Sequence, residues 1–213
     1  MILNVKSLES YFKWYWNSGT WKTTTWRGVE ARKVVTDMWN YQEIISSHQV
    51  TLVIECGARK GGSTLFFADL LTGLKRDWQI LSIDIVDDWD AQVNHERITK
   101  LVADSGGEEA KNTMKAAISQ TKGKVFAILD SDHTKKHVLR ELETMNSVLR
   151  KGDYLLVEDT CINGHPINEK FGPGPYEAVE EFMAKNLESF IRDVERENKF
   201  GITCAPMGFW IKK

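Results

Sequence analysis

The chain has 213 residues, which is enough for one domain with a substantial hydrophobic core. Its formal net charge of −2 gives no reason to expect a nucleic acid or a membrane as a partner. The three separated cysteines, Cys56, Cys161 and Cys204, form no C-x-x-C pair and indicate neither a disulfide framework nor a thiolate zinc site. No signal peptide and no run of about 18 apolar residues is recognisable, so we expect a cytoplasmic globular protein.

Residues 1–35 are predicted to form a tryptophan-rich N-terminal arm without a clean helical or strand period. Four of the eight tryptophans fall there: Trp14, Trp16, Trp21 and Trp26. The arm either packs over the core, with its indoles filling grooves, or forms a lid over a ligand cleft. It is also a candidate interface for a homo-oligomer. Residues 36–213 are expected to form a single domain that begins with a helix from Asp37 to Ser47.

Strands and helices are predicted to alternate after this helix. The strands are expected at 51–55, 79–84, 98–103, 124–129 and 153–158. The helices are expected at 62–73, 89–96, 108–120, 134–149 and 175–186. The strands are rich in Val, Ile and Leu without strict alternation, which is typical of a parallel sheet covered on both faces. With a closing antiparallel hairpin near 189–194 and 200–211, the predicted fold is α/β. It is a Rossmann-like, doubly wound, mostly parallel seven-stranded sheet.

The first predicted strand leads into a glycine-rich loop, which is the most informative segment of the chain. Glycine allows the backbone to approach a ligand that a side chain would exclude. The G-x-x-x-G-G spacing differs from the G-x-G-x-x-G pattern that wraps a dinucleotide pyrophosphate. It favours S-adenosylmethionine, which carries no phosphate. The candidate cofactor-binding residues of this loop are Glu55, Gly57, Gly61, Gly62 and Ser63. Glu55 either anchors the loop or faces the methionine part of the cofactor.

Acidic residues stand at the carboxyl ends of successive strands, where an open parallel sheet binds its ligands. Asp84 ends the second strand and is placed to accept both ribose hydroxyls of the cofactor. Asp104 and Ser105 follow the third strand and are placed near the adenine, unless they cap a helix instead. Asp130 follows the fourth strand and is also a candidate cofactor ligand.

A second group of acids follows the fourth and fifth strands. Asp130 and Glu158 lie 28 residues apart, a separation that a strand–helix–strand crossover uses, so their strand ends are expected to be neighbours. Converging carboxylates repel one another unless a cation compensates, and oxygen ligands favour Mg²⁺ or another hard divalent cation. The alternative is that these acids cap a helix or pair with Lys135, Lys136 or His133. The preferred metal ligands are Asp130, Glu158 and Asp159, with Asp132 in reserve.

Motifs along most of the chain resemble the cephalosporin hydroxylase-like and rhamnosyl O-methyltransferase family, a branch of the class I S-adenosylmethionine methyltransferases. They occupy residues 26–29, 37–45, 55–57, 61–63, 83–85, 129–134, 152–160, 174–179 and 205–209. The resemblance implies methyl transfer to a hydroxyl of a sugar or natural-product small molecule. It also implies a divalent metal at the positions matched by Asp130, Glu158 and Asp159. Arg59-Lys60 departs from the family pattern, in which small or neutral residues are more usual.

A sugar hydroxyl must lose its proton during methyl transfer, and a histidine is the usual general base. His133 is the closest candidate in the sequence, unless it merely starts a helix, and His165 is a weaker one. Asp130 belongs to the catalytic group because it would help to bind the metal that activates the hydroxyl. Two other classes stay open. One is an NAD(P)-dependent oxidoreductase, although no Tyr-x-x-x-Lys set is present; the other is a non-catalytic cofactor-binding partner protein.

Overall fold

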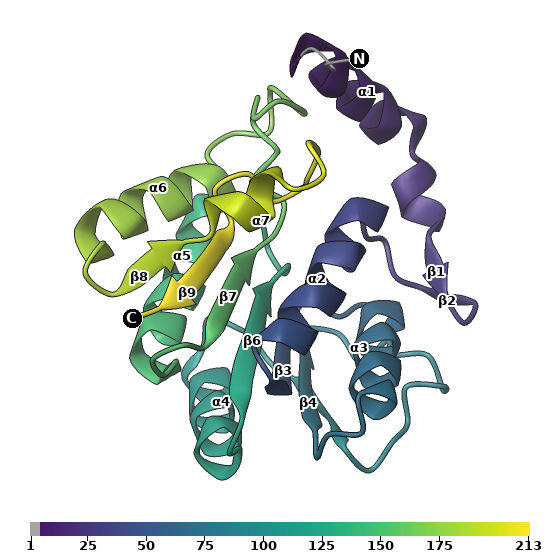
Figure 1. Ribbon diagram of the computed structural model, residues 1–213, viewed down its shortest axis with the longest axis vertical. Coiled ribbons are helices and arrows are strands. Elements are labelled where there is room, and N and C mark those ends of the chain that lie inside the picture. Colours follow the sequence, from purple (N-terminus) through teal and green to yellow (C-terminus); the bar gives the residue numbers. More distant parts are fainter. Residues whose placement is uncertain (1–4) are drawn as a thin grey trace.

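The computed structural model describes residues 5–213, and Figure 1 shows a central sheet between two layers of helices. The strand order is β5-β4-β3-β6-β7-β9-β8. The pairs among β3 to β7 are parallel, whereas β9 pairs antiparallel with both β7 and β8. The predicted fold class is confirmed, including the closing antiparallel pair. The strands are β3 (Val50–Cys56), β4 (Gln79–Asp84), β5 (Ile98–Val102), β6 (Lys124–Leu129), β7 (Tyr154–Val157), β8 (Phe190–Arg192) and β9 (Phe209–Lys212).

Two apolar layers hold the helices against the sheet, because successive strand residues point to opposite faces. Val53 and Phe126 pack with α2 (Val35–Ser47) and α3 (Gly62–Gly73) on one face. Ile54 and Ala127 pack on the other face, which is covered by three helices. Both faces are therefore buried, which explains the unbroken apolar runs of the sequence. The three helices are α4 (Glu108–Gln120), α5 (Lys135–Val148) and α6 (Pro175–Asn186).

Two local predictions are wrong. Residues 89–96 form turns rather than a helix, because Asp90 donates its backbone N–H to the Lys60 carbonyl of the glycine loop at 2.9 Å. Its side chain closes a turn by accepting the Gln92 N–H at 2.9 Å. The predicted hairpin strand at 200–211 is confined to β9, and a short helix, α7 (Val194–Asn198), follows β8.

The arm is more regular than its sequence indicates, although its first four residues lie outside the described part of the chain. It forms α1 (Val5–Ser18), the 3₁₀ helix η1 (Thr20–Thr23), and a small hairpin of β1 (Thr25–Trp26) and β2 (Val29–Glu30). In Figure 1 the purple α1 lies at one end of the molecule, beyond the carboxyl edge of the sheet. Phe12 and Tyr15 of α1 pack in a cluster with Cys161 and Cys204. None of the helices among residues 5–213 has the length and apolar character needed to cross a lipid bilayer.

Gly57 stands where the loop after β3 crosses the loop after β6. Its φ is +90°, and a Cβ placed on it would lie 1.9 Å from the backbone oxygen of Asp130. We expect Gly57→Ala to lower the free energy of unfolding by about 2 kcal/mol or more. The added methyl group would clash with the Asp130 backbone, and alanine is strained at this positive φ. Urea denaturation measures the change.

Gly73→Ala is the matched control, since no atom lies within 4 Å of a Cβ at this helix end. It should change the free energy of unfolding by less than about 1 kcal/mol. Equal stabilities of the two variants would contradict the close crossing at Gly57.

Candidate active site

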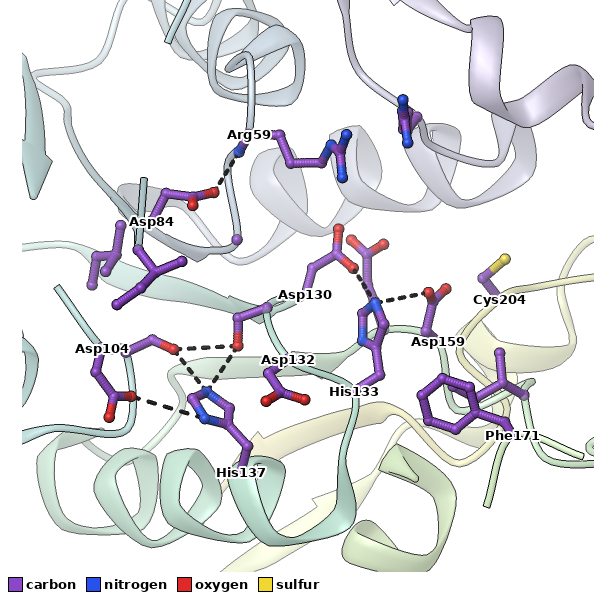
Figure 2. Close-up of a pocket in the computed structure, with 18 of the residues that line it drawn as sticks. Arg59, Asp84, Asp104, Asp130, Asp132, His133, His137, Asp159, Phe171 and Cys204 are labelled. Atoms are coloured by element: carbon purple, nitrogen blue, oxygen red, sulfur yellow. Dashed lines mark hydrogen bonds and ion pairs between the residues drawn. The ribbon is translucent and has the colours of Figure 1, made fainter. Parts of the chain in front are cut away.

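A cavity of about 780 Å³ opens at the carboxyl edge of the parallel strands. Figure 2 shows acids from several strand ends directed toward this one space. The structure therefore brings together side chains that are far apart in the sequence. The predicted site residues that line the cavity are Gly57, Asp84, Asp104, Ser105, Asp130, Asp132, His133, Glu158 and Asp159.

Asp84 meets the glycine loop at the cofactor end of the cavity. Its Oδ2 accepts the backbone N–H of Arg59 at 2.7 Å, and its Oδ1 accepts that of Val86 at 3.1 Å. These bonds fix the carboxylate beside the backbone of Arg59 (Figure 2), and both Asp84 and Gly57 line the cavity. The guanidinium of Arg59 is drawn toward Glu30, whose Oε1 lies 3.4 Å from its Nε.

The other predicted loop residues do not line the cavity. Glu55 is fully buried and accepts a hydrogen bond from the Thr64 hydroxyl at 2.6 Å, so it anchors the start of α3. Burial raises the pKa of Glu55 above its usual value. Gly62 lets α3 approach β2, because a Cβ there would lie 2.4 Å from the Glu30 carbonyl oxygen. Gly61 and Ser63 flank it at the same helix start.

A polar group from α5 surrounds the predicted adenine position. Asp104 Oδ2 accepts a hydrogen bond from Arg140 at 2.6 Å, and the Ser105 hydroxyl donates to Glu141 Oε1 at 2.6 Å. His137 Nε2 lies 3.1 Å from the Ser105 hydroxyl. The sequence reasoning missed these three α5 residues. Their spacing in the sequence could have indicated them, since residues three and four positions apart lie on the same face of a helix.

The acid cluster, defined here as Asp130, Glu158 and Asp159, forms because β6 and β7 lie side by side. Leu129 pairs with Val157 in register, and the Glu158 N–H donates to the Leu129 carbonyl at 2.9 Å. The residues that follow each strand therefore converge. His133 Nε2 lies 3.2 Å from Asp159 Oδ2 and 4.0 Å from Asp130 Oδ1, and Figure 2 shows it between them.

Lys33 is the main residue that sequence reasoning missed. Its side chain is 2% exposed, and its Nζ lies 2.5 Å from Asp130 Oδ2 and 2.7 Å from Glu158 Oε1. Burial alone would lower the pKa of Lys33, but the two carboxylates outweigh it and raise the pKa well above the usual value. No local signal distinguishes this lysine, because it follows an arginine in a segment that looks solvent-exposed.

The cluster fits a hard divalent cation. One ligand atom each of Asp130, His133 and Asp159 lies within 4.8 Å of the others. Burial, followed by the nearby charge of Asp130, raises the pKa of Glu158 well above its usual value. Burial also raises the pKa of Asp159 to about 6. Three carboxylates therefore face one ammonium, that of Lys33, and carboxylate oxygens are the ligands that Mg²⁺ prefers.

Asp159 also belongs to a second group of possible ligand atoms, with Cys161 and Cys204. Burial raises the pKa of Cys161 to about 11, and the hydrogen bond with Cys161 raises that of Cys204. A raised thiol pKa disfavours the thiolate, which is the form that binds a metal. The oxygen-rich acid cluster is the better candidate.

Two predicted residues are engaged elsewhere. Asp132 Oδ1 accepts the backbone N–H of Thr134 at 2.8 Å, at the start of α5, which accounts for its lowered pKa. His165 Nε2 lies 3.0 Å from Glu177 Oε1, and its ring stacks on Tyr176 at 3.6 Å. The part of the cavity lining that the structure describes does not include His165.

An aromatic wall closes the end of the cavity opposite the adenine position. Trp16 and Trp21 of the arm stack with ring centroids 4.4 Å apart, and both line the cavity. Ile162 and Phe171 of the β7–α6 loop line it as well. Figure 2 shows Phe171 near Asp159, away from Asp104. The cavity thus has a polar end and an aromatic end, with the acid cluster between them.

The Rhamnosyl O-methyltransferase/CmcI family model matches residues 18–213. The chain belongs to this family of S-adenosylmethionine-dependent methyltransferases. The predicted family membership is therefore confirmed. The "Rhamnosyl O-methyltransferase" of Mycobacterium leprae (strain TN) is 43% identical over 206 residues, which cover 96% of this chain and 90% of the relative. The protein of the same name from Mycobacterium tuberculosis (strain ATCC 25618 / H37Rv) is also 43% identical and is covered to 84%.

A solved CmcI structure described as "Mg-SAM" has a similar fold. The TM-score is 0.67 at 17% sequence identity, and the match covers 90% of this chain and 77% of that chain. At this identity the likeness concerns the fold alone.

His137, at the polar end of the cavity, is expected to make the stability of the protein depend on pH. The hydrogen bond to Glu141 raises its pKa above 6.5 in the folded protein. The stabilisation is complete below the unfolded pKa of about 6.5 and is lost as the pH rises through the folded pKa. We therefore expect the free energy of unfolding of wild type, relative to His137→Gln, to be larger at about pH 6 than at about pH 9. Urea denaturation at both pH values measures it, and a constant difference would contradict a charged His137.

Proposed function

We propose that the chain transfers the methyl group of S-adenosylmethionine to a hydroxyl of a sugar or natural-product small molecule. One observation carries the proposal: the carboxylates of Asp84 and Asp130 line a single cavity on either side of Gly57. This is where an open parallel sheet binds a nucleoside cofactor. The family and the names of the relatives support the same activity.

The cofactor would lie along the glycine loop. Asp84 would accept the ribose hydroxyls, Asp104 and Ser105 would contact the adenine, and Asp130 would face the methionine part. The positive charges of Arg59 and Lys60 are each paired with an acidic side chain, which reduces their repulsion of a sulfonium ligand. Arg59 faces Glu30, and Lys60 Nζ lies 2.5 Å from Asp88.

The acceptor hydroxyl would lie at the acid cluster. Asp130, Glu158 and Asp159 would hold a divalent cation, which when bound lowers the pKa of a hydroxyl and fixes its position. His133 would take the proton, because it lines the cavity and its Nε2 lies 3.2 Å from Asp159 Oδ2. Alignment of the oxygen behind the activated methyl group contributes about 7–11 kcal/mol to lowering the barrier.

The arm would act as a lid that closes the acceptor end. Trp16 and Trp21 line the cavity from the arm, so the same segment that packs on the core also faces the ligand. Indole rings offer large apolar surfaces with low conformational entropy, which suits the apolar face of a sugar ring. The two interpretations of the arm are therefore compatible.

Substitutions of Asp84 and of Asp130 should each weaken the binding of a different ligand, S-adenosylhomocysteine for Asp84 and Mg²⁺ for Asp130. Asp84→Asn should weaken binding of S-adenosylhomocysteine by about tenfold or more, because charged hydrogen bonds to the ribose are lost, and should leave Mg²⁺ binding unchanged. Asp130→Asn should abolish Mg²⁺ binding while the affinity for S-adenosylhomocysteine changes by less than about threefold. Isothermal titration calorimetry measures both. Unaltered Mg²⁺ binding in Asp130→Asn would remove this residue from the metal site.

The lid predicts a difference between two tryptophans of the arm. Trp21→Ala should raise the KM for a probe acceptor such as methyl α-L-rhamnoside by about tenfold, because a stacking surface is lost. The affinity for S-adenosylhomocysteine should stay unchanged. Trp14→Ala is the matched control, since its side chain is 62% exposed and is not among the described residues that line the cavity. Equal KM values for the two variants would contradict the lid.

A further inference from the structure

We propose that Lys33 is a positioning residue that serves as the permanent counter-cation of the acid cluster. Its ammonium holds Asp130 and Glu158 together in the metal-free protein and lowers the affinity of the cluster for a divalent cation. The proposal rests on the metal site of the proposed function and adds to it a residue that sets how tightly the metal binds.

Lys33 acts from behind the cluster rather than from the cavity. Its neighbours Arg32 and Val34 line the cavity, whereas Lys33 is absent from that lining in the described chain. It occupies Oδ2 of Asp130 and Oε1 of Glu158. Asp130 Oδ1 faces His133 on the cavity side. Lys33 therefore does not line the cavity, but its ion pairs hold one oxygen of each of the two carboxylates.

The backbone of Lys33 is held as firmly as its side chain. The Lys33 N–H donates to the Thr24 hydroxyl at 3.1 Å, and this hydroxyl donates to the Trp21 carbonyl at 2.9 Å. The same hydroxyl is 3.3 Å from the Lys33 carbonyl oxygen. Lys33 thus joins the arm to the acid cluster through fixed contacts at both of its ends.

The charges of the cluster match this role. Asp130, Glu158 and Asp159 carry three negative charges when ionised, and Lys33 carries one positive charge, so the net charge is −2. One divalent cation neutralises that remainder. A second positive charge near a metal ion repels it, so Lys33 makes binding weaker than three carboxylates alone would. Without Lys33, however, the metal-free protein would hold the buried Glu158 and the partly buried Asp130 with no compensating charge, which is costly.

Lys33→Met tests the proposal, because methionine keeps much of the length of the side chain and removes its charge. In EDTA the variant should have a lower Tm than wild type. Saturating Mg²⁺ should raise its Tm by more than it raises that of wild type. The Kd for Mg²⁺, measured by calorimetry at about pH 8, should fall by about tenfold or more. An unchanged or weaker Mg²⁺ affinity, without the larger rise in Tm, would overturn the proposal.

Two controls separate charge from bulk and from loss of a surface lysine. Lys33→Arg keeps the charge and should keep the wild-type Mg²⁺ affinity. Lys115→Met makes the same change on the exposed surface of α4 and should behave as wild type in EDTA and in Mg²⁺. Tighter Mg²⁺ binding in Lys33→Arg as well would show that charge is not the cause, and would overturn the proposal.

The double variant Lys33→Met/Glu158→Gln covers the case in which Lys33→Met alone does not fold. The double variant should then fold in EDTA, because one negative charge has been removed together with the positive charge. If Lys33→Met does fold, it should cost less stability in the Glu158→Gln background than in wild type. A double variant that also fails to fold, or additive costs, would overturn the counter-cation role. Binding of S-adenosylhomocysteine to the same samples keeps the two proposals distinguishable. If wild type binds Mg²⁺ and S-adenosylhomocysteine but Lys33→Met leaves the Mg²⁺ affinity unchanged, only the role of Lys33 fails.

Discussion

The in-register pairing of β6 with β7 is the constraint on which the rest of the site depends. It places the partly exposed Asp130 and Asp159 beside Glu158, which is buried. Burial first, and the nearby charge of Asp130 after it, raise the pKa values of Glu158 and Asp159, because neighbouring carboxylates stay ionised only at a cost unless a cation compensates them. Lys33 compensates one of the three negative charges of the cluster. The negative charge that is left uncompensated is the physical reason to expect a divalent cation, independently of any resemblance to other proteins.

The same constraint joins the arm to the catalytic region. Lys33 reaches the cluster only because the segment after β2 runs along the carboxyl edge of the sheet, where Gly62 lets β2 pack against α3. The Thr24 hydroxyl ties this segment to η1, which carries Trp21. The aromatic wall and the acid cluster are therefore connected by one short stretch of chain. Displacing the arm would disturb the charge balance as well as the acceptor surface.

The sequence predicted the sheet, its order of elements and the gathering of acids, because these follow from local apolar runs and from the geometry of parallel strands. It failed where a contact is made at long range. Residues 89–96 have helix-like composition, but Asp90 and the glycine loop bind each other's backbone instead. Lys33 lies 97 residues from Asp130 along the chain, and no spacing rule joins them. For Glu55 two interpretations were open, an anchor of the loop or a contact to the methionine part of the cofactor, and its hydrogen bond from Thr64 supports the anchor.

Asp130 shows how one side chain can serve both ends of the cavity. It follows β6, next to β3, so its backbone crosses the glycine loop at Gly57 while its carboxylate faces β7. One carboxylate oxygen is bound to Lys33 and the other is directed toward His133. The residue is thus fixed by backbone on the cofactor side and by charge on the acceptor side. Such a fixed position matters for methyl transfer, because the reaction depends on the alignment of donor and acceptor more than on any new bond to the protein. A change that loosens Asp130 would therefore misalign both partners at once.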